Sequence, residues 1–330
     1  MWCNKGTAIF TKIIKFFILI ICIIIIHTPM QTQKEEVRFF IIDSSFNELK
    51  FMWMVNKFLG YGKNVPRENV EWIYKLTALV DSYKSHLSKV TLSNRGINTD
   101  AKIITKKGEV FYFMNGKILP SEDISQEDQY RSYFYRYQLG ESYQKYQREG
   151  KKDFPASLNY SFLNSLYGEP SIEIENELET FRVLGRKVRF NHAQDTSERL
   201  KAVFKEIQDM AAQNSEVRKW IKGIRSISTY SNRTVQNRQR PSLHSYGIAV
   251  DILPRDRSKF IYWEWVKDFK EDWWNVKEEQ KAKVPGLVIE IFEKNGFVWG
   301  GKWYFFDIMH FEYRPELIKY AQLLKDDPLN

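Results

Sequence analysis

Two short stretches near the C-terminus hold the residues best suited to chemistry. His244 and Asp251 share the first stretch, and His310 lies in the second, in a chain with only five histidines. Imidazole nitrogen and carboxylate oxygen are common zinc ligands, and a catalytic zinc keeps three protein ligands and a fourth position for water. We therefore interpret these residues as the three ligands of a catalytic Zn²⁺, with Asp307 or Glu312 handling the proton.

Other catalytic signatures are missing from the sequence. It has no His-Glu-x-x-His zinc motif, no Gly-x-Ser-x-Gly nucleophile motif and no glycine-rich phosphate loop. Both cysteines, Cys3 and Cys22, lie within the first 30 residues, so the rest of the chain has no thiol and no disulfide. A metal in that part would depend on histidine and carboxylate ligands.

The first 30 residues have the pattern of an export signal. Lysines precede an uncharged apolar run at residues 16–26. A run of about 7 to 15 apolar residues suits a secretory signal, whereas a spanning helix needs about 20. We expect residues 1–30 to be a signal peptide or an uncleaved N-terminal membrane anchor. Either one predicts an exported protein of the periplasm or cell envelope.

Residues 31–150 are interpreted as an N-terminal α+β accessory region. Apolar spacing predicts an amphipathic helix near residues 71–83. Asn115-Gly116, between β-prone residues, predicts a hairpin with a type I′ turn. A Tyr- and Arg-rich cluster at residues 130–137 has the composition of a surface that stacks sugars or bases, but we interpret it as half-buried helix surface.

Residues 151–330 are interpreted as the catalytic domain. Apolar residues with helical spacing follow Asp195, and Asp195 together with Glu198 resembles a capping box. A second helix is predicted between Pro285 and Asn295. Three strands are predicted after it, at residues 297–299, 302–306 and 309–313, the first two joined by a turn at Gly300-Gly301. Alternation along the last strand places His310 and Glu312 on one face.

Composition and charge exclude some classes of function. Hydrophobic residues make up 43% of the chain and aromatic residues 15%, so it can bury a core and is not disordered in bulk. The net charge of +9 comes from basic residues scattered among acidic ones. We interpret this as an ordinary solvated surface, with a mild bias that would suit an anionic cell-wall polymer. No nucleic-acid-binding motif is present.

The two stretches resemble the VanY-type zinc D-alanyl-D-alanine carboxypeptidase family, which also includes L-alanyl-D-glutamate endopeptidases. The resemblance covers about residues 185–317, with a weaker echo at residues 160–168, and does not extend to residues 36–120. It rests on Ser-Leu-His-Ser-Tyr-Gly-Ile-Ala-Val-Asp at residues 242–251 and Phe-Val-Trp-Gly-Gly-Lys-Trp-Tyr-Phe-Phe-Asp-Ile-Met-His-Phe-Glu-Tyr-Arg-Pro-Glu-Leu at residues 297–317. It implies an α+β fold, similar to Hedgehog and DD-peptidases, in which helices flank an antiparallel sheet.

The resemblance also implies roles for individual residues. His244, Asp251 and His310 match the three zinc ligands of the family, and Asp307 matches its catalytic acid/base. Arg233 matches the arginine that steadies the substrate carbonyl or carboxylate.

Three further residues are predicted near the substrate. Glu312 is the alternative base, because strand alternation puts it on the His310 face. Ser242 and Tyr246 are predicted to line the substrate pocket, with a purely structural role as the alternative for each. Trp299 and Trp303 are interpreted as core or cleft wall.

The resulting hypothesis is an exported zinc peptidase acting on peptidoglycan stem peptides. D-Ala-D-Ala carboxypeptidase activity is the first reading, and L-Ala-D-Glu endopeptidase activity is the alternative within the family. The competing class is a noncatalytic, zinc-containing module that binds the cell wall. No feature of the sequence fixes the oligomeric state.

Overall fold

The computed structural model describes residues 36–60, 66–95, 98–140, 158–170, 172–232 and 241–327. The predicted leader and Arg233 lie outside these residues. The fold is α+β with antiparallel sheets, as the resemblance implied. A search of the described ranges for a helix long and apolar enough to cross a membrane finds none.

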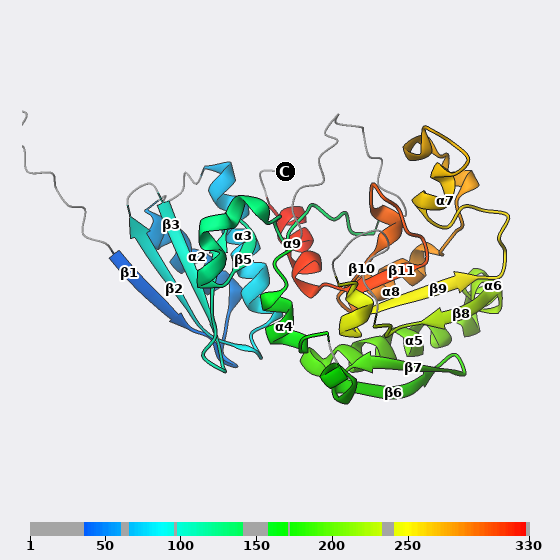
Figure 1. Ribbon diagram of the computed structural model, residues 1–330, viewed down its shortest axis with the longest axis horizontal. Coiled ribbons are helices and arrows are strands. Elements are labelled where there is room, and N and C mark those ends of the chain that lie inside the picture. The colour runs from blue at the N-terminus through cyan, green and yellow to red at the C-terminus, as the bar shows by residue number, and fades with distance from the viewer. Residues whose placement is uncertain are drawn as a thin grey trace, which may run out of the picture.

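The N-terminal region is a five-stranded antiparallel sheet in the order β1-β2-β3-β4-β5. Its strands are β1 (Glu36–Ile41), β2 (Leu87–Arg95), β3 (Asn98–Thr105), β4 (Val110–Met114) and β5 (Lys117–Leu119). Helices α2 (Glu48–Leu59) and α3 (Arg67–Ser82) pack on this sheet, and α3 confirms the predicted helix (Figure 1). Edge-to-face ring pairs hold the layers together, Phe51 against Phe40 at 5.2 Å and Trp72 against Phe113 at 5.7 Å.

The predicted hairpin at Asn115-Gly116 is confirmed. The two residues join β4 to β5, where Met114 pairs with Lys117. Asn115 has φ 48° and Gly116 has φ 87°, and positive φ at both central positions defines a type I′ turn. The chain then continues through a 3₁₀-helix, η1 (Ser121–Gln129), toward the C-terminal region.

The C-terminal region contains a four-stranded antiparallel sheet in the order β10-β11-β9-β8, together with a separate β6-β7 hairpin. The strands are β6 (Leu178–Val183), β7 (Arg186–Asn191), β8 (Ile224–Ser228), β9 (Ala249–Pro254), β10 (Phe297–Trp299) and β11 (His310–Tyr313). The α-helices are α4 (Ser161–Tyr167), α5 (Thr196–Gln213), α6 (Ser215–Gly223), α7 (Trp263–Lys267), α8 (Gly286–Lys294) and α9 (Pro315–Lys325). Short 3₁₀-helices lie between them: η2 (Ile172–Glu177), η3 (Ala193–Asp195), η4 (Leu243–Tyr246), η5 (Trp273–Asn275), η6 (Glu278–Gln280) and η7 (Gly300–Lys302).

Aromatic packing joins α8 to the sheet. Phe292 of α8 stacks on Phe311 of β11 at 3.8 Å and meets Phe204 of α5 edge to face at 6.0 Å. The helices α5 and α8 confirm the two helices predicted in this region. Because β11 carries both His310 and Phe311, this packing fixes the position of the strand in the core.

Three local predictions were wrong. Residues 130–137 do not form a helix surface, because the 3₁₀-helix η1 ends at Gln129 and the segment after it is not helical. Asp195 does not cap α5, because it has φ 57° and its side chain makes no capping hydrogen bond. Residues 302–306 do not form a strand, and β10 pairs instead with β11. The chain turns through η7 close to the Trp299 indole, where a Cβ on Gly301 would collide with that ring. Because Gly301 has no Cβ, the backbone can turn this close to the indole. The chain therefore leaves the sheet after β10 instead of returning beside it as a hairpin strand.

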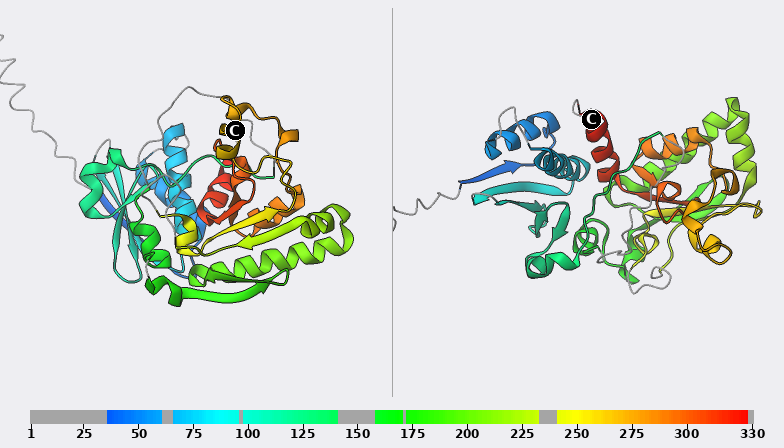
Figure 2. Two further views of the ribbon diagram at one scale, coloured as in Figure 1. Left: turned by 45° about the vertical axis from the view of Figure 1, so that its right-hand side comes forward. Right: turned by 90° about the horizontal axis from the view of Figure 1, so that it is seen from above.

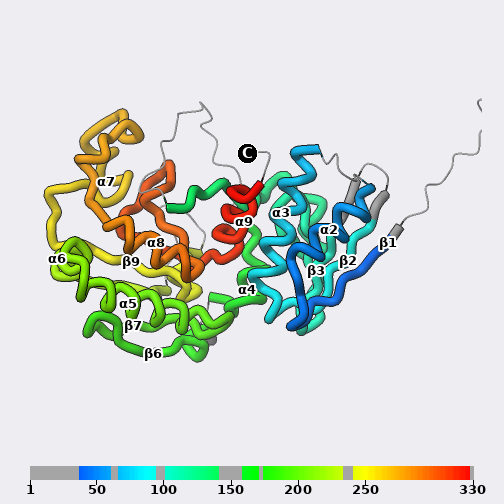
Figure 3. The backbone as a smooth tube through the Cα atoms, turned by 180° about the vertical axis from the view of Figure 1, so that it is seen from behind, coloured from blue at the N-terminus to red at the C-terminus, as the bar shows by residue number. Residues whose placement is uncertain are grey.

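Helix α9 links the two regions. It continues directly from β11, yet it packs against α3 of the N-terminal region, and Figures 1 and 3 show it between α3 and the C-terminal sheet. Tyr320 of α9 meets Phe134 edge to face at 5.5 Å, and its hydroxyl donates to Glu71 of α3 at 3.2 Å. The view from above in Figure 2 shows the same central position. The segment carrying His310 is therefore anchored at both ends by packed structure.

Candidate metal centre

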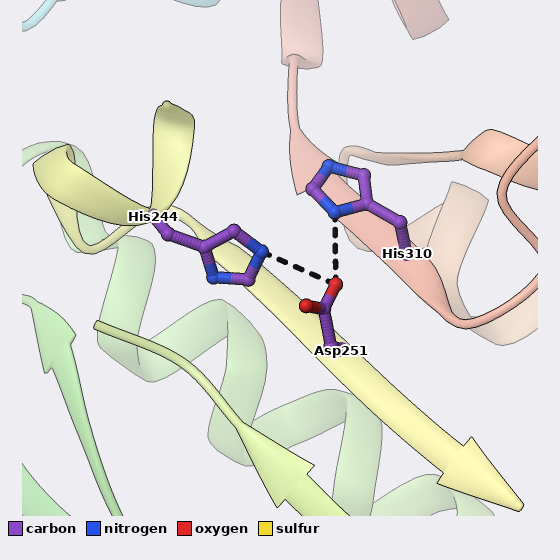
Figure 4. Close-up of side chains that lie close together, drawn as sticks. All are labelled: His244, Asp251 and His310. Atoms are coloured by element: carbon purple, nitrogen blue, oxygen red, sulfur yellow. Dashed lines mark hydrogen bonds and ion pairs between the residues drawn. The ribbon is translucent and has the colours of Figure 1, made fainter. Parts of the chain in front are cut away.

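The candidate site is built on two neighbouring strands and one turn. β9 and β11 are antiparallel neighbours, and their register places His310 directly opposite Asp251. Side chains opposite each other on one face of a sheet lie close together. His244 comes from η4, the turn just before β9, and Figure 4 shows both imidazoles pointing at the Asp251 carboxylate.

The three side chains converge closely enough to bind one ion. Asp251 Oδ1 lies 3.1 Å from His244 Nε2 and 3.0 Å from His310 Nδ1. One ligand atom from each residue lies within 4.8 Å of the other two. His244 Nε2 is buried, and within the described part of the chain it has no well-aligned hydrogen bond. A buried nitrogen of this kind beside a carboxylate and a second imidazole is what a metal ligand requires.

The other nitrogen of His244 is held by the backbone. Nδ1 lies 2.6 Å from the carbonyl oxygen of Thr229, which only accepts, so Nδ1 carries the proton and donates. This leaves Nε2 as the lone-pair nitrogen that faces Asp251. Ser242 caps the turn, since its hydroxyl oxygen accepts from the His244 backbone N–H at 3.3 Å.

Gly247 ends this turn in a left-handed conformation that favours glycine. Its φ is 66°, its N–H donates to the His244 carbonyl at 3.0 Å, and its carbonyl accepts from Asn191 N–H at 2.9 Å. A Cβ there would lie 2.5 Å from Leu178 Cδ2 and 3.1 Å from the Asn191 nitrogen. Glycine is therefore needed both for the left-handed backbone and for the close approach of β7.

Gly247→Ala is expected to destabilise the metal-free protein. Positive φ costs a non-glycine residue about 1–3 kcal/mol, and the overlap with Leu178 and Asn191 adds about 1–3 kcal/mol. Gly185→Ala is the matched control, because Gly185 has φ 78° but open space around its Cβ position. Denaturant unfolding should show the larger loss for Gly247→Ala. Equal losses would mean that close packing at Gly247 is unimportant.

His310 is held from both sides. Its Nδ1 faces Asp251, and its Nε2 lies 3.2 Å from Glu312 Oε2, which confirms that the strand puts His310 and Glu312 on one face. Burial opposes a charge on His310, but hydrogen bonds to Asp251 and Glu312 and their charges outweigh it and raise its pKa to about 10. A metal ion must therefore displace a proton from this imidazole.

The pKa values of the two carboxylates, Asp251 and Glu312, are lowered, whereas that of His310 is raised. Burial alone would raise the pKa of Asp251, yet the neighbouring imidazoles hold it well below its usual range. Burial also works against ionised Glu312, but His310 and the positive charge of Arg314 keep the pKa of Glu312 low. Both acids are therefore ionised at neutral pH. Glu312 contacts the ring nitrogen turned away from Asp251, so its carboxylate lies on the far side of the imidazole.

Asp307 lies at the turn that leads into β11. Its carbonyl accepts from His310 N–H at 3.3 Å, and its own N–H donates to Gly300 at 2.9 Å. Its Oδ1 is buried, and among the described residues the group within ligand distance consists of His244, Asp251 and His310. The backbone of Asp307 therefore lies next to that of His310, its side chain is outside the three-residue ligand group, and its proton-handling role stays a prediction.

The remaining predicted residues take different positions. Tyr246 is fully buried, and its hydroxyl lies 2.6 Å from the Asn164 side chain, which fits its structural alternative. Trp299 is a core residue. The Trp303 ring lies 5.3 Å from the His310 ring, and its Nε1–H donates to the Tyr135 hydroxyl at 2.9 Å, so it packs beside a predicted ligand.

Sequence reasoning missed the residues behind His310. Glu312 contacts Arg314, and Arg314 contacts Glu316. Glu316 in turn accepts a hydrogen bond from Tyr83, which lies 233 positions away in the sequence. Thr229 was missed as well, because it contributes a backbone carbonyl rather than a side chain. Nothing in the spacing of these residues indicates that they meet.

One of three comparisons with known proteins finds a match. Residues 236–313 match the family model described as D-alanyl-D-alanine carboxypeptidase. No curated protein and no solved structure matches the chain. The matched segment includes all three residues of the His–Asp–His group, together with Asp307 and Glu312. Over residues 236–313, this chain is thus similar to the D-alanyl-D-alanine carboxypeptidase family, as its VanY-type motifs predicted.

Proposed function

We propose that the protein is a zinc-dependent D-Ala-D-Ala carboxypeptidase that trims peptidoglycan stem peptides. The convergence of His244, Asp251 and His310 is the observation that carries this proposal. Two imidazole nitrogens and one carboxylate oxygen are a typical donor set for catalytic zinc, and the family match supplies the class of reaction. An export signal would place the enzyme beside its substrate.

The chain's own residues have distinct tasks in this reaction. A zinc ion at the three ligands would polarise the scissile carbonyl and lower the pKa of water to about 7. Asp307 would accept a proton from the attacking water and return it to the leaving amine. Arg233 would offer paired N–H donors to the substrate carbonyl or terminal carboxylate. Glu312 would hold His310 with Nδ1 directed at the metal position.

Digestion of defined muropeptides tests the proposal. The purified chain, loaded with zinc, is incubated with pentapeptide and tetrapeptide muropeptides, and the products are identified by mass spectrometry. We expect D-alanine to be released from the pentapeptide, and a chelator to stop the release until zinc is restored. Cleavage between L-Ala and D-Glu would instead support the endopeptidase alternative. A folded, zinc-loaded chain that releases nothing would support the noncatalytic wall-binding module.

A further inference from the structure

We propose that a buried network of hydrogen bonds and ion pairs, running from the N-terminal region to His310, positions this ligand for the metal. The network consists of Glu312, Arg314, Glu316 and Tyr83. The inference rests on the metal centre of the proposed function, but it concerns metal affinity rather than hydrolysis. It gives the N-terminal region, which lies outside the matched family segment, a role in the site.

Each link is a direct contact. His310 Nε2 lies 3.2 Å from Glu312 Oε2, and Glu312 Oε1 lies 3.4 Å from an Arg314 Nη1 donor. Arg314 Nε donates to Glu316 Oε1, and the Tyr83 hydroxyl donates to Glu316 Oε2 at 2.7 Å. Arg314 Nη2 also donates to the Tyr133 carbonyl at 2.7 Å. Tyr83 follows α3, so the last contacts come from residues that precede the C-terminal sheet in the sequence.

The residues of this network are almost completely shielded from solvent. Arg314 is 4% exposed, Glu316 1% and Tyr83 2%. Buried charges are costly unless each is paired and hydrogen-bonded, and buried ion pairs often stabilise a fold less than apolar packing would. A gain in stability alone therefore does not account for this buried network. Its contact with His310 gives another reason for it, because paired charges fix the orientation of the side chains they hold.

The geometry shows how the orientation is transmitted. His310 and Glu312 occupy one face of β11, Arg314 directly precedes α9, and Glu316 lies in the first turn of α9. Arg314 holds the Glu312 carboxylate at His310 Nε2, so that Nε2–H donates to Glu312 and Nδ1 faces Asp251, where its lone pair would meet the metal once the Nδ1 proton is displaced. Glu316 and the Tyr133 carbonyl in turn hold the guanidinium, and the Tyr83 hydroxyl holds the Glu316 carboxylate. The N-terminal region thereby contributes to the support of a ligand that belongs to the C-terminal sheet.

Zinc affinity of the full chain, measured by competition with a chromophoric chelator, tests this inference. Glu312→Gln should weaken zinc binding about 10- to 100-fold, the range for outer-shell partners of metal ligands. Tyr83→Phe removes one hydroxyl and keeps the ring, and we expect a smaller loss of about 3- to 10-fold. Thermal unfolding of the metal-free variants, measured alongside, reports any separate effect on stability.

Tyr137→Phe is the matched control. Tyr137 is buried, and its hydroxyl donates to the buried carboxylate of Glu293 at 2.7 Å, the same distance as between Tyr83 and Glu316. Glu293 pairs with Lys302 and not with a predicted ligand. Tyr137→Phe should therefore lower thermal stability without weakening zinc binding.

The outcomes separate the inference from the proposed function. If Glu312→Gln and Tyr83→Phe bind zinc as tightly as the parent chain, or if Tyr83→Phe matches Tyr137→Phe, the positioning role is refuted while the metal centre stands. If the folded parent chain binds no zinc, both the inference and the proposed function fail. A selective affinity loss in Glu312→Gln and Tyr83→Phe supports the inference even if the chain cleaves no muropeptide.

Discussion

Asp251→Ala is expected to abolish metal binding and hydrolysis together. Asp251 Oδ1 lies about 3 Å from both imidazoles, so the carboxylate supplies the negative charge and the central ligand of the group. Without it, two imidazoles remain, and one of them binds a proton firmly because Glu312 still faces it. We expect zinc affinity to fall by more than about 100-fold, beyond the range for outer-shell partners. Elemental analysis after dialysis and the muropeptide assay measure the two effects.

Two further variants make this result specific. Asp251→Asn keeps the shape of the side chain and should lose zinc as well, which separates charge from packing. Asp256→Asn changes an exposed carboxylate in the loop after β9, and should keep both zinc and activity. Circular dichroism should show all three proteins folded. Full zinc retention in Asp251→Ala would contradict the assignment of this ligand.

Asp307→Ala is expected to abolish hydrolysis while zinc stays bound. Removing a general acid/base typically costs about 10²- to 10⁴-fold in rate, and Asp307 is not one of the three converging ligands. Asp307→Asn should behave in the same way, because an amide holds the position but cannot accept the proton. The measurements are the turnover rate on the pentapeptide and the zinc content of the same sample.

The comparison with Glu312→Gln assigns the base. Glu312 touches the nitrogen of His310 that faces away from Asp251, so its loss should act mainly on zinc affinity. Asp307 variants should instead lose rate at unchanged zinc affinity. Near-normal turnover in Asp307→Ala, with a zinc-saturated Glu312→Gln inactive, would move the role to Glu312.

The parts of the fold that local physics dictates could be predicted from the sequence. Apolar periodicity gave α3, α5 and α8, and Asn115-Gly116 gave the type I′ turn because it needs positive φ at both positions. The aromatic run at residues 302–306 has strand propensity, but in the fold Phe305 stacks on Trp273 at 5.1 Å, and the Gly300-Gly301 turn diverts the chain. Tertiary packing overrode the local preference there.

The candidate site also combines features that local sequence sets with features that tertiary packing sets. The ligands lie in short motifs, so the residue types and the strand alternation of His310 and Glu312 were visible in the sequence. The support behind them was not. Tyr83 meets Glu316 across 233 positions, and Thr229 acts through a backbone carbonyl that any residue type would supply. Contacts of this kind depend on how two regions pack, which one sequence does not reveal.

Anomalous diffraction at the zinc edge, from crystals of the zinc-loaded chain, tests the central claim most directly. We predict one zinc peak per chain, about 2.0–2.2 Å from His244 Nε2, an Asp251 carboxylate oxygen and His310 Nδ1. A peak at another location, or one bound through His310 Nε2 in place of Nδ1, would contradict the account.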